Sequence, residues 1–235
     1  MNEGKTQHLL CTLRRGDNSA GQADKVKLLG FWVDPELNWR DHTDNVCTKL
    51  SRVLHLLRRL KYTINPQFLV MVYHALMHSH INYGLIWWGH ATGCRRVLAI
   101  QKKAVRLITG SGYRDHCRPL FTKTGILTIY SQYCLSTLIS LKDDLPKFQL
   151  RGEIHNHATR HGRDIDLPRC RLKKTSNSYP MSAVKLYNML PSHVKSLDSN
   201  KMEAMLRKIF VNKPLYSLDE IDVGYFLTPP PSSAL

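Results

Sequence analysis

The spacing of apolar residues changes along this chain, and the change separates strand-like from helix-like segments. Thr6–Leu13 and Val26–Val33 are short and apolar, and the stretch between them is polar and contains two glycines. Two short apolar segments that flank such a loop are typical of paired β-strands. Pro35 follows the second segment, and we expect it to end that strand.

Beyond this proline the spacing becomes helical. Apolar residues recur at alternating intervals of four and three, at Val46, Leu50, Val53, Leu57 and Leu60. The period predicts one helix from about Asp41 to Lys61 with a single buried face. Asn38 or Asp41 is expected to cap its first turn. A second helix is predicted to begin at Asn65–Pro66, because proline is favoured in a first turn, and its expected apolar face is Leu69, Val72 and Leu76.

Later segments repeat the helical pattern. We predict helices over Gly93–Thr109, Leu127–Asp143, Ser182–Leu190 and Lys201–Phe210, with an irregular basic connector over Phe148–Tyr179 and a disordered tail over Thr228–Leu235. The expected fold is mainly α, with a small β-strand pair before a helical bundle and an irregular basic C-terminal region. The expected division of the chain is 1–36 for the strand pair, 37–147 for the bundle, 148–227 for the connector with the last helices, and 228–235 for the tail.

One stretch of 33 residues, Tyr62–Cys94, contains no Asp, Glu, Lys or Arg. Met71–Gly89 within it holds three histidines, a serine and an asparagine, which is too polar for a comfortable membrane span. We interpret the uncharged stretch as the central helix pair of the bundle, with Tyr83, Trp87 and Trp88 filling its core.

Composition adds a class of partner. The 235 residues include 34 Lys and Arg against 18 Asp and Glu, a formal net charge of +16. Such an excess favours a polyanionic partner, and nucleic acid is the commonest one. The six cysteines are spaced too widely for a disulfide scaffold or a zinc ribbon, and no N-glycosylation sequon or signal peptide is visible. We therefore expect an intracellular protein with reduced thiols that is not secreted.

Candidate metal and catalytic groups are few. His74 and His78 have the spacing of a zinc-binding helix but lack the glutamate of that motif, and the cluster His155, His157 and His161 is flanked by arginines. We expect helix-face and loop histidines at these places, without a metal. Asp143–Asp144 is the single Asp-Asp pair in the sequence, and its position after an apolar segment predicts a helix end instead of a two-magnesium site.

Basic residues gather on two predicted helices. Arg95, Lys102 and Arg106 fall on one face of Gly93–Thr109, with Arg96 and Lys103 beside them. The first helix adds Lys49, Arg52 and Arg59. A solvated basic face and a surface for nucleic-acid phosphates are both compatible with this pattern. The concentration of cations on two neighbouring helices favours phosphate contact.

The order of several short segments resembles the C-terminal part of a non-long-terminal-repeat (LINE-type) retrotransposon reverse transcriptase, with most similarity to the jockey group. The segments cover about residues 3–222 and begin at Lys5-Thr-Gln. They continue with VKLLGFWVDPELNWRDHTDNV, INYGLIWWG, IQKKAVRLITG, LFTKTGIL, NHATRH and VKLYNMLPSHVK.

This resemblance implies that the strand pair is the edge of a polymerase palm and that the helices are a thumb and post-thumb region that hold a template–primer duplex of RNA and DNA. It matches Lys5 to the palm lysine and Leu29–Gly30 to the primer-grip turn. The family's Tyr-x-Asp-Asp motif is absent from these residues. The resemblance therefore implies a non-catalytic fragment in a nuclear or cytoplasmic ribonucleoprotein, with no cofactor of its own, since Mg²⁺ would belong to the missing palm.

Two interpretations without polymerase ancestry stay open. One is a basic helical nucleic-acid-binding module, and the other is a protein-interaction bundle whose charge serves solubility. Binding to nucleic acid at several salt concentrations distinguishes them.

Overall fold

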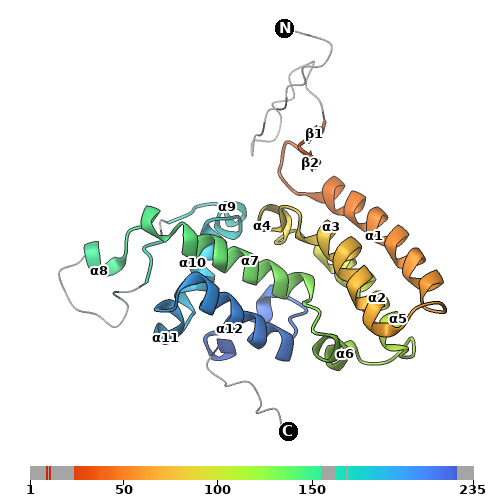
Figure 1. Cartoon of the computed structure of the whole chain (residues 1–235). Helices are drawn as coiled ribbons and strands as arrows, with labels where there is room; N and C mark the ends of the chain where they lie inside the picture. The colour runs from red at the N-terminus through yellow and green to blue at the C-terminus, as the bar shows by residue number, and fades with distance from the viewer. Residues whose placement is uncertain are drawn as a thin grey trace.

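The computed structural model describes residues 9, 11, 24–154, 162, 164–167 and 169–226. It is mainly helical, with one two-stranded antiparallel sheet ahead of the helices, which confirms the expected fold class (Figure 1). Within the described part of the chain, no helix is long and apolar enough to cross a membrane. The predicted strand Thr6–Leu13 lies outside the described residues except for Leu9 and Cys11, which are in neither a helix nor a strand.

The strand predicted over Val26–Val33 is instead a complete hairpin. Strand β1 (Val26–Leu28) pairs with β2 (Phe31–Val33), and Leu29 and Gly30 form the turn between them. Both turn residues have positive φ, +47° and +88°, the backbone conformation that a two-residue hairpin turn requires. The prediction of one strand was wrong because a single glycine was enough to reverse the chain.

The first group of helices surrounds a common core. Helix α1 (Arg40–Leu60) and helix α5 (Cys94–Thr109) begin side by side and make the most extensive helix pairing of the fold, so they run in the same direction. A return helix runs between them. It consists of α2 (Pro66–Val72), the π-helical segment η2 (Tyr73–His78) and α3 (Ser79–Asn82), and short α4 (Leu85–Trp88) follows.

Helices α1 and α5 confirm the predictions from apolar spacing. The seam of α1 is buried from Val46 to Leu57, and α5 ends at Gly110, whose φ of +70° closes the helix as a left-handed cap. The predicted N-cap of α1 was wrong. Trp39 occupies that position in a left-handed conformation without a side-chain cap, while Asn38 donates to Glu36 and Asp41 pairs with Lys25.

The return helix buries a different face from the one predicted. Leu69 is buried as expected, but the next buried residues follow at intervals of four: Tyr73, Met77 and Ile81. Val72 is half-buried and Leu76 is 37% exposed. A π-helical segment closes its hydrogen bonds over five residues instead of four, so the buried stripe drifts away from the α-helical pattern.

The expected core of Tyr83, Trp87 and Trp88 holds for only one of the three. Trp88 is fully buried, whereas Trp87 is 49% and Tyr83 is 53% exposed. Helix α4 has a single turn and buries one side, with Leu85 and Trp88 three residues apart facing inward. Trp87 consequently points to the other side, and the ring of Tyr83 stacks on Phe31 of the hairpin at 5.0 Å between centroids.

The second group of helices packs around α7 (Ile129–Asp143), which contacts α5 as well as the later helices. Helices α10 (Met181–Asn188) and α12 (Ser199–Asn212) pack directly on α7. The other helices of this part are α6 (Cys117–Thr124), which packs on α5; α8 (Arg151–Ile154); α9 (Lys173–Asn177), which packs on α10; and α11 (Ser192–Lys195), with 3₁₀ turns at Leu145–Lys147, Leu218–Glu220 and Val223–Phe226. The four later predicted helices are confirmed to within two residues at each end, and α6 and α11 were missed. Helices α8 and α9 were missed as well, and they lie inside the connector Phe148–Tyr179 that was expected to be irregular. Buried residues of both groups form one continuous core, and the expected boundary at 147/148 stays a prediction.

Candidate nucleic-acid interface

The cations predicted on α1 lie on its solvent-exposed side. Lys49, Arg52 and Arg59 are all exposed. Lys49 lies towards the return helix, close enough to His42 and His80 for its charge to add to the effect of burial, which lowers the pKa of both imidazoles. Nothing in the described residues neutralises Arg52 or Arg59 through a hydrogen bond or ion pair.

On α5, Arg96 and Lys103 are exposed as well. Arg96 forms an ion pair with Asp44 of α1, which joins the starts of the two helices. Lys103, two turns further along, has no ion pair with any described residue. Arg52 and Arg59 on α1 and Lys103 on the neighbouring helix α5 are therefore exposed cations that no described residue neutralises.

The stripe Arg95, Lys102 and Arg106 does share one face of α5, but other parts of the chain partly cover it: Lys102 and Arg106 are half-buried, and Arg95 is exposed. The ammonium of Lys102 lies 3.6 Å from the ring centroid of Tyr216, and the guanidinium of Arg118 lies 4.7 Å from the same ring. Burial lowers the pKa of Lys102 and raises the pKa of Tyr216 to about 12. This arrangement is a cation–π cluster that holds the segment after α12, which contains Tyr216, against α5.

Arg106 is also occupied locally. Its Nε and Nη2 both donate to the backbone oxygen of Asp115, at 3.1 and 2.8 Å. Arg95 points into a hollow of about 530 Å³ beside Tyr130 and Asp219. The three cations were expected to act as one surface. Instead, Lys102 and Arg106 contact other parts of the chain, and Arg95 lines the hollow.

The turn Leu29–Gly30, expected to match a primer grip, projects from the hairpin. Leu29 is 79% exposed, and its carbonyl accepts a hydrogen bond from the hydroxyl of Tyr83. The turn is thereby fixed to the linker that precedes α4. Lys5, the expected palm lysine, lies outside the described residues.

The described residues contain no group of three or more side chains placed to hold a metal ion. The rings of His74 and His78 lie 5.4 Å apart, and Nε2 of His78 is 3.3 Å from Oε1 of Gln132. Residues His155, His157 and His161 are outside the described part of the chain.

The Asp143–Asp144 pair ends α7, as predicted. The hydroxyl of Ser199 donates to Asp143, and Lys147 forms an ion pair with Asp144 at 2.6 Å. A hydrogen bond from Lys147 lowers the pKa of Asp144. Both carboxylates therefore serve local contacts at a helix end.

No pattern in the sequence indicates the cluster around Tyr216. Arg118 lies in α6 and Tyr216 follows α12, so the two residues are far apart in the chain. They meet only because the segment after α12 packs back against α5 and α6. Comparison with family models, with curated proteins and with solved structures found no match for this chain.

Proposed function

We propose that this chain binds the backbone of a template–primer duplex of RNA and DNA as the thumb and post-thumb part of a non-long-terminal-repeat retrotransposon reverse transcriptase. In this role α1, the return helix and α5 act as the thumb, and the chain contributes binding without polymerising. Its place is an intracellular ribonucleoprotein, nuclear or cytoplasmic.

The observation that carries the proposal is the distribution of charge on the paired helices. Helix α1 contains five basic and two acidic residues, and α5 contains five basic and no acidic residues. Asp41 and Asp44 are paired with Lys25 and Arg96, which leaves Arg52, Arg59 and Lys103 unopposed. Lys and Arg on one exposed surface bind phosphates and release the counterions of the nucleic acid.

The ancestry part of the proposal is supported by the order of the sequence segments described above, from Lys5-Thr-Gln to VKLYNMLPSHVK. A palm with a Tyr-x-Asp-Asp motif encoded in frame just upstream would support this ancestry. A different domain in that place would contradict it without affecting the binding proposal.

Binding is tested by measuring the affinity for an RNA–DNA duplex at several salt concentrations. Replacing Arg52, Arg59 and Lys103 with Gln should reduce the slope of log K against log salt by about two to three, since each lost phosphate contact removes roughly one unit. The matched control replaces three exposed cations of α12, Lys201, Arg207 and Lys208, with Gln. Equal slopes for the parent and both variants would contradict the proposal.

The non-catalytic part is tested by primer extension with deoxynucleotides and Mg²⁺. We expect no extension, because two magnesium ions need a pair of free carboxylates, and both carboxylates of Asp143–Asp144, the single Asp-Asp pair in the sequence, already contact Ser199 and Lys147. Extension that disappears when Asp143 and Asp144 are replaced with Ala would overturn this part.

A further inference from the structure

Two adjoining hollows form a groove between the start of α5 and α9. One has a volume of about 620 Å³ and reaches the start of α1, and the other has about 530 Å³ and reaches α7 and α10. Both are lined by His90, Ala91, Thr92 and Asn177, so they are parts of one surface depression. We call it the α5–α9 groove.

The walls of the groove are basic. Arg40, Arg96 and Lys174 line the first hollow, and Arg95 and Lys185 line the second, against the acids Asp44 and Asp219.

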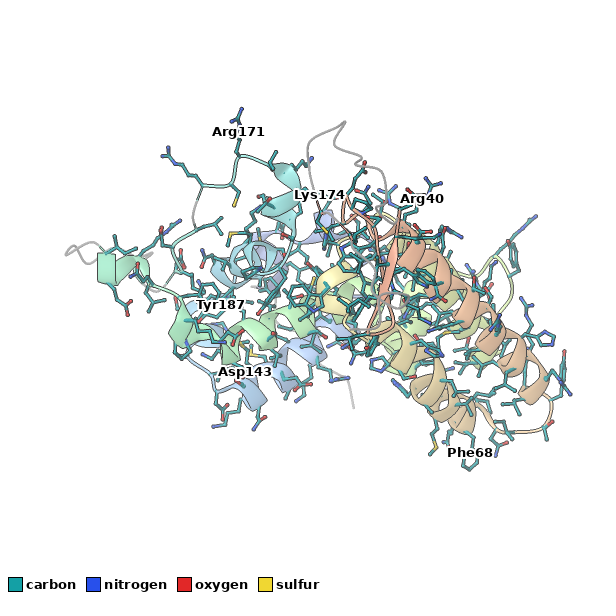
Figure 2. The ribbon with its side chains drawn as sticks, turned by 90° about the horizontal axis from the view of Figure 1, so that it is seen from above. Arg40, Phe68, Asp143, Arg171, Lys174 and Tyr187 are labelled. Carbon is teal, nitrogen blue, oxygen red and sulfur yellow. The ribbon has the colours of Figure 1, made fainter. Side chains whose placement is uncertain are left out.

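These cations differ in the hydrogen bonds and ion pairs that their side chains already make. Arg96 is paired with Asp44, and Lys185 donates to Ser176. Lys174 donates only to the uncharged amide oxygen of Asn38, at 2.8 Å, and the exposed Arg40 has no side-chain hydrogen bond or ion pair with any described residue (Figure 2). Lys174 and Arg40, contributed by α9 and α1, therefore face the same hollow with charges that no acid neutralises.

The wall shared by the two hollows contains an unsatisfied polar atom. The Nδ1 of His90 is buried and has no hydrogen-bond partner among the described residues. Burial lowers the pKa of this imidazole, and the charge of Lys174 adds to the effect, so the ring is neutral at pH 7.

An aromatic pair lies close along the chain to two residues that line both hollows, although neither ring lines a hollow itself. Trp87 precedes His90 by three residues, and Tyr179 follows Asn177 by two. Their rings meet edge to face at 5.7 Å between centroids, and Trp87 keeps 49% of its surface exposed. A half-exposed tryptophan held by a neighbouring ring has a face to offer to another flat group.

We propose that the α5–α9 groove binds a single strand of nucleic acid, with phosphates at Arg40 and Lys174 and a base stacked on Trp87. A basic groove that follows one backbone, with an aromatic side chain beside it, is the general architecture of single-strand binding sites. The inference rests on the proposed function and adds a second site to it, where a strand that leaves the duplex would lie.

The test measures fluorescence anisotropy of a labelled oligothymidylate of about twenty nucleotides and, separately, of an RNA–DNA duplex. Trp87→Leu should weaken single-strand binding about tenfold and leave duplex binding unchanged, and Trp87→Phe should recover most of the loss because it keeps an aromatic face. Replacing Arg40 and Lys174 with Gln should reduce the salt slope for the single strand by about one to one and a half. Replacing Lys201 and Lys208 with Gln is the control and should not change it.

Three results would overturn the inference. They are an unchanged single-strand affinity in Trp87→Leu, an equal loss for single strand and duplex, and a double charge variant that behaves like the control. If the parent binds the duplex but Trp87→Leu has no effect, this inference alone fails. If the parent binds neither form, the proposed function fails with it. A melting curve of Trp87→Leu that matches the parent shows that any loss of affinity is not a loss of folding.

Discussion

Trp87 and Trp88 are neighbours in the chain, yet they lie in opposite environments, and this difference is measurable. Trp88 is fully buried and its Nε1 donates to the carbonyl of Tyr83, whereas Trp87 is half-exposed. Trp88→Ala should lower the free energy of unfolding by about 3–5 kcal/mol through a cavity in the core. Trp87→Ala should cost about 1 kcal/mol or less. Urea unfolding of both variants checks this, and similar losses would contradict the placement of Trp87.

His42 is another residue whose environment has a measurable effect. It is 4% exposed, it is surrounded by the rings of Phe31, Trp39 and Trp88, and neither ring nitrogen has a hydrogen-bond partner among the described residues. Burial, with a smaller effect from Lys49, lowers its pKa from 6.5 to about 4.

Between about pH 6.5 and pH 4, the unfolded chain binds a proton at His42 and the folded chain does not. Folding stability should therefore fall as the pH is lowered through this window, by at most about 3 kcal/mol from this residue. His42→Phe should show a shallower pH dependence than the parent in urea unfolding. The pKa values of His74, His80 and His90 are also lowered by burial and act in the same direction, so the difference between parent and variant isolates His42. Identical pH profiles would contradict the account.

At the scale of elements, the spacing of apolar residues predicted α1 and α5 because each buries one side, whereas α7 is buried nearly all round. It failed where local backbone geometry overrides the period. The π-helical segment Tyr73–His78 moved the buried stripe away from Leu76, and the positive φ of Leu29 made a hairpin from an apparent single strand. Helix α11 has four residues, too few to show a period at all.

Two helix caps give a prediction at the same scale. The hydroxyl of Thr128 accepts from the backbone nitrogen of Ser131 at the start of α7 and donates to the carbonyl of Leu215, and it is fully buried. Asp198 caps α12 at an exposed position. Thr128→Ala should cost about 2–3 kcal/mol, since it also leaves a buried carbonyl unpaired, and Asp198→Ala should cost about 1 kcal/mol. Thermal or urea unfolding compares the two, and the reverse order would contradict the described packing.

At the scale of the whole molecule, sequence alone identified the charged helices but not the surface they form. Helical geometry correctly placed Lys102 and Arg106 on one face of α5, yet it could not show that Tyr216 and Asp115 cover that face. The α5–α9 groove was likewise invisible, because its cations come from α1, α5, α9 and α10 and meet only in the folded chain. The strongest remaining candidates for duplex contact are the exposed cations of the α1–α5 pair.

The proposed contact between the α1–α5 pair and a duplex is best tested by lysine footprinting, because one experiment reports on each lysine and includes its own controls. The protein is treated with an amine-reactive reagent, with and without an RNA–DNA duplex, and modification is measured by mass spectrometry. We expect the duplex to protect Lys49 and Lys103, which are exposed on α1 and α5. Lys201 and Lys208, which are exposed on α12, should stay reactive. Protection of the α12 lysines alone, or no protection at a duplex concentration that saturates binding, would contradict it.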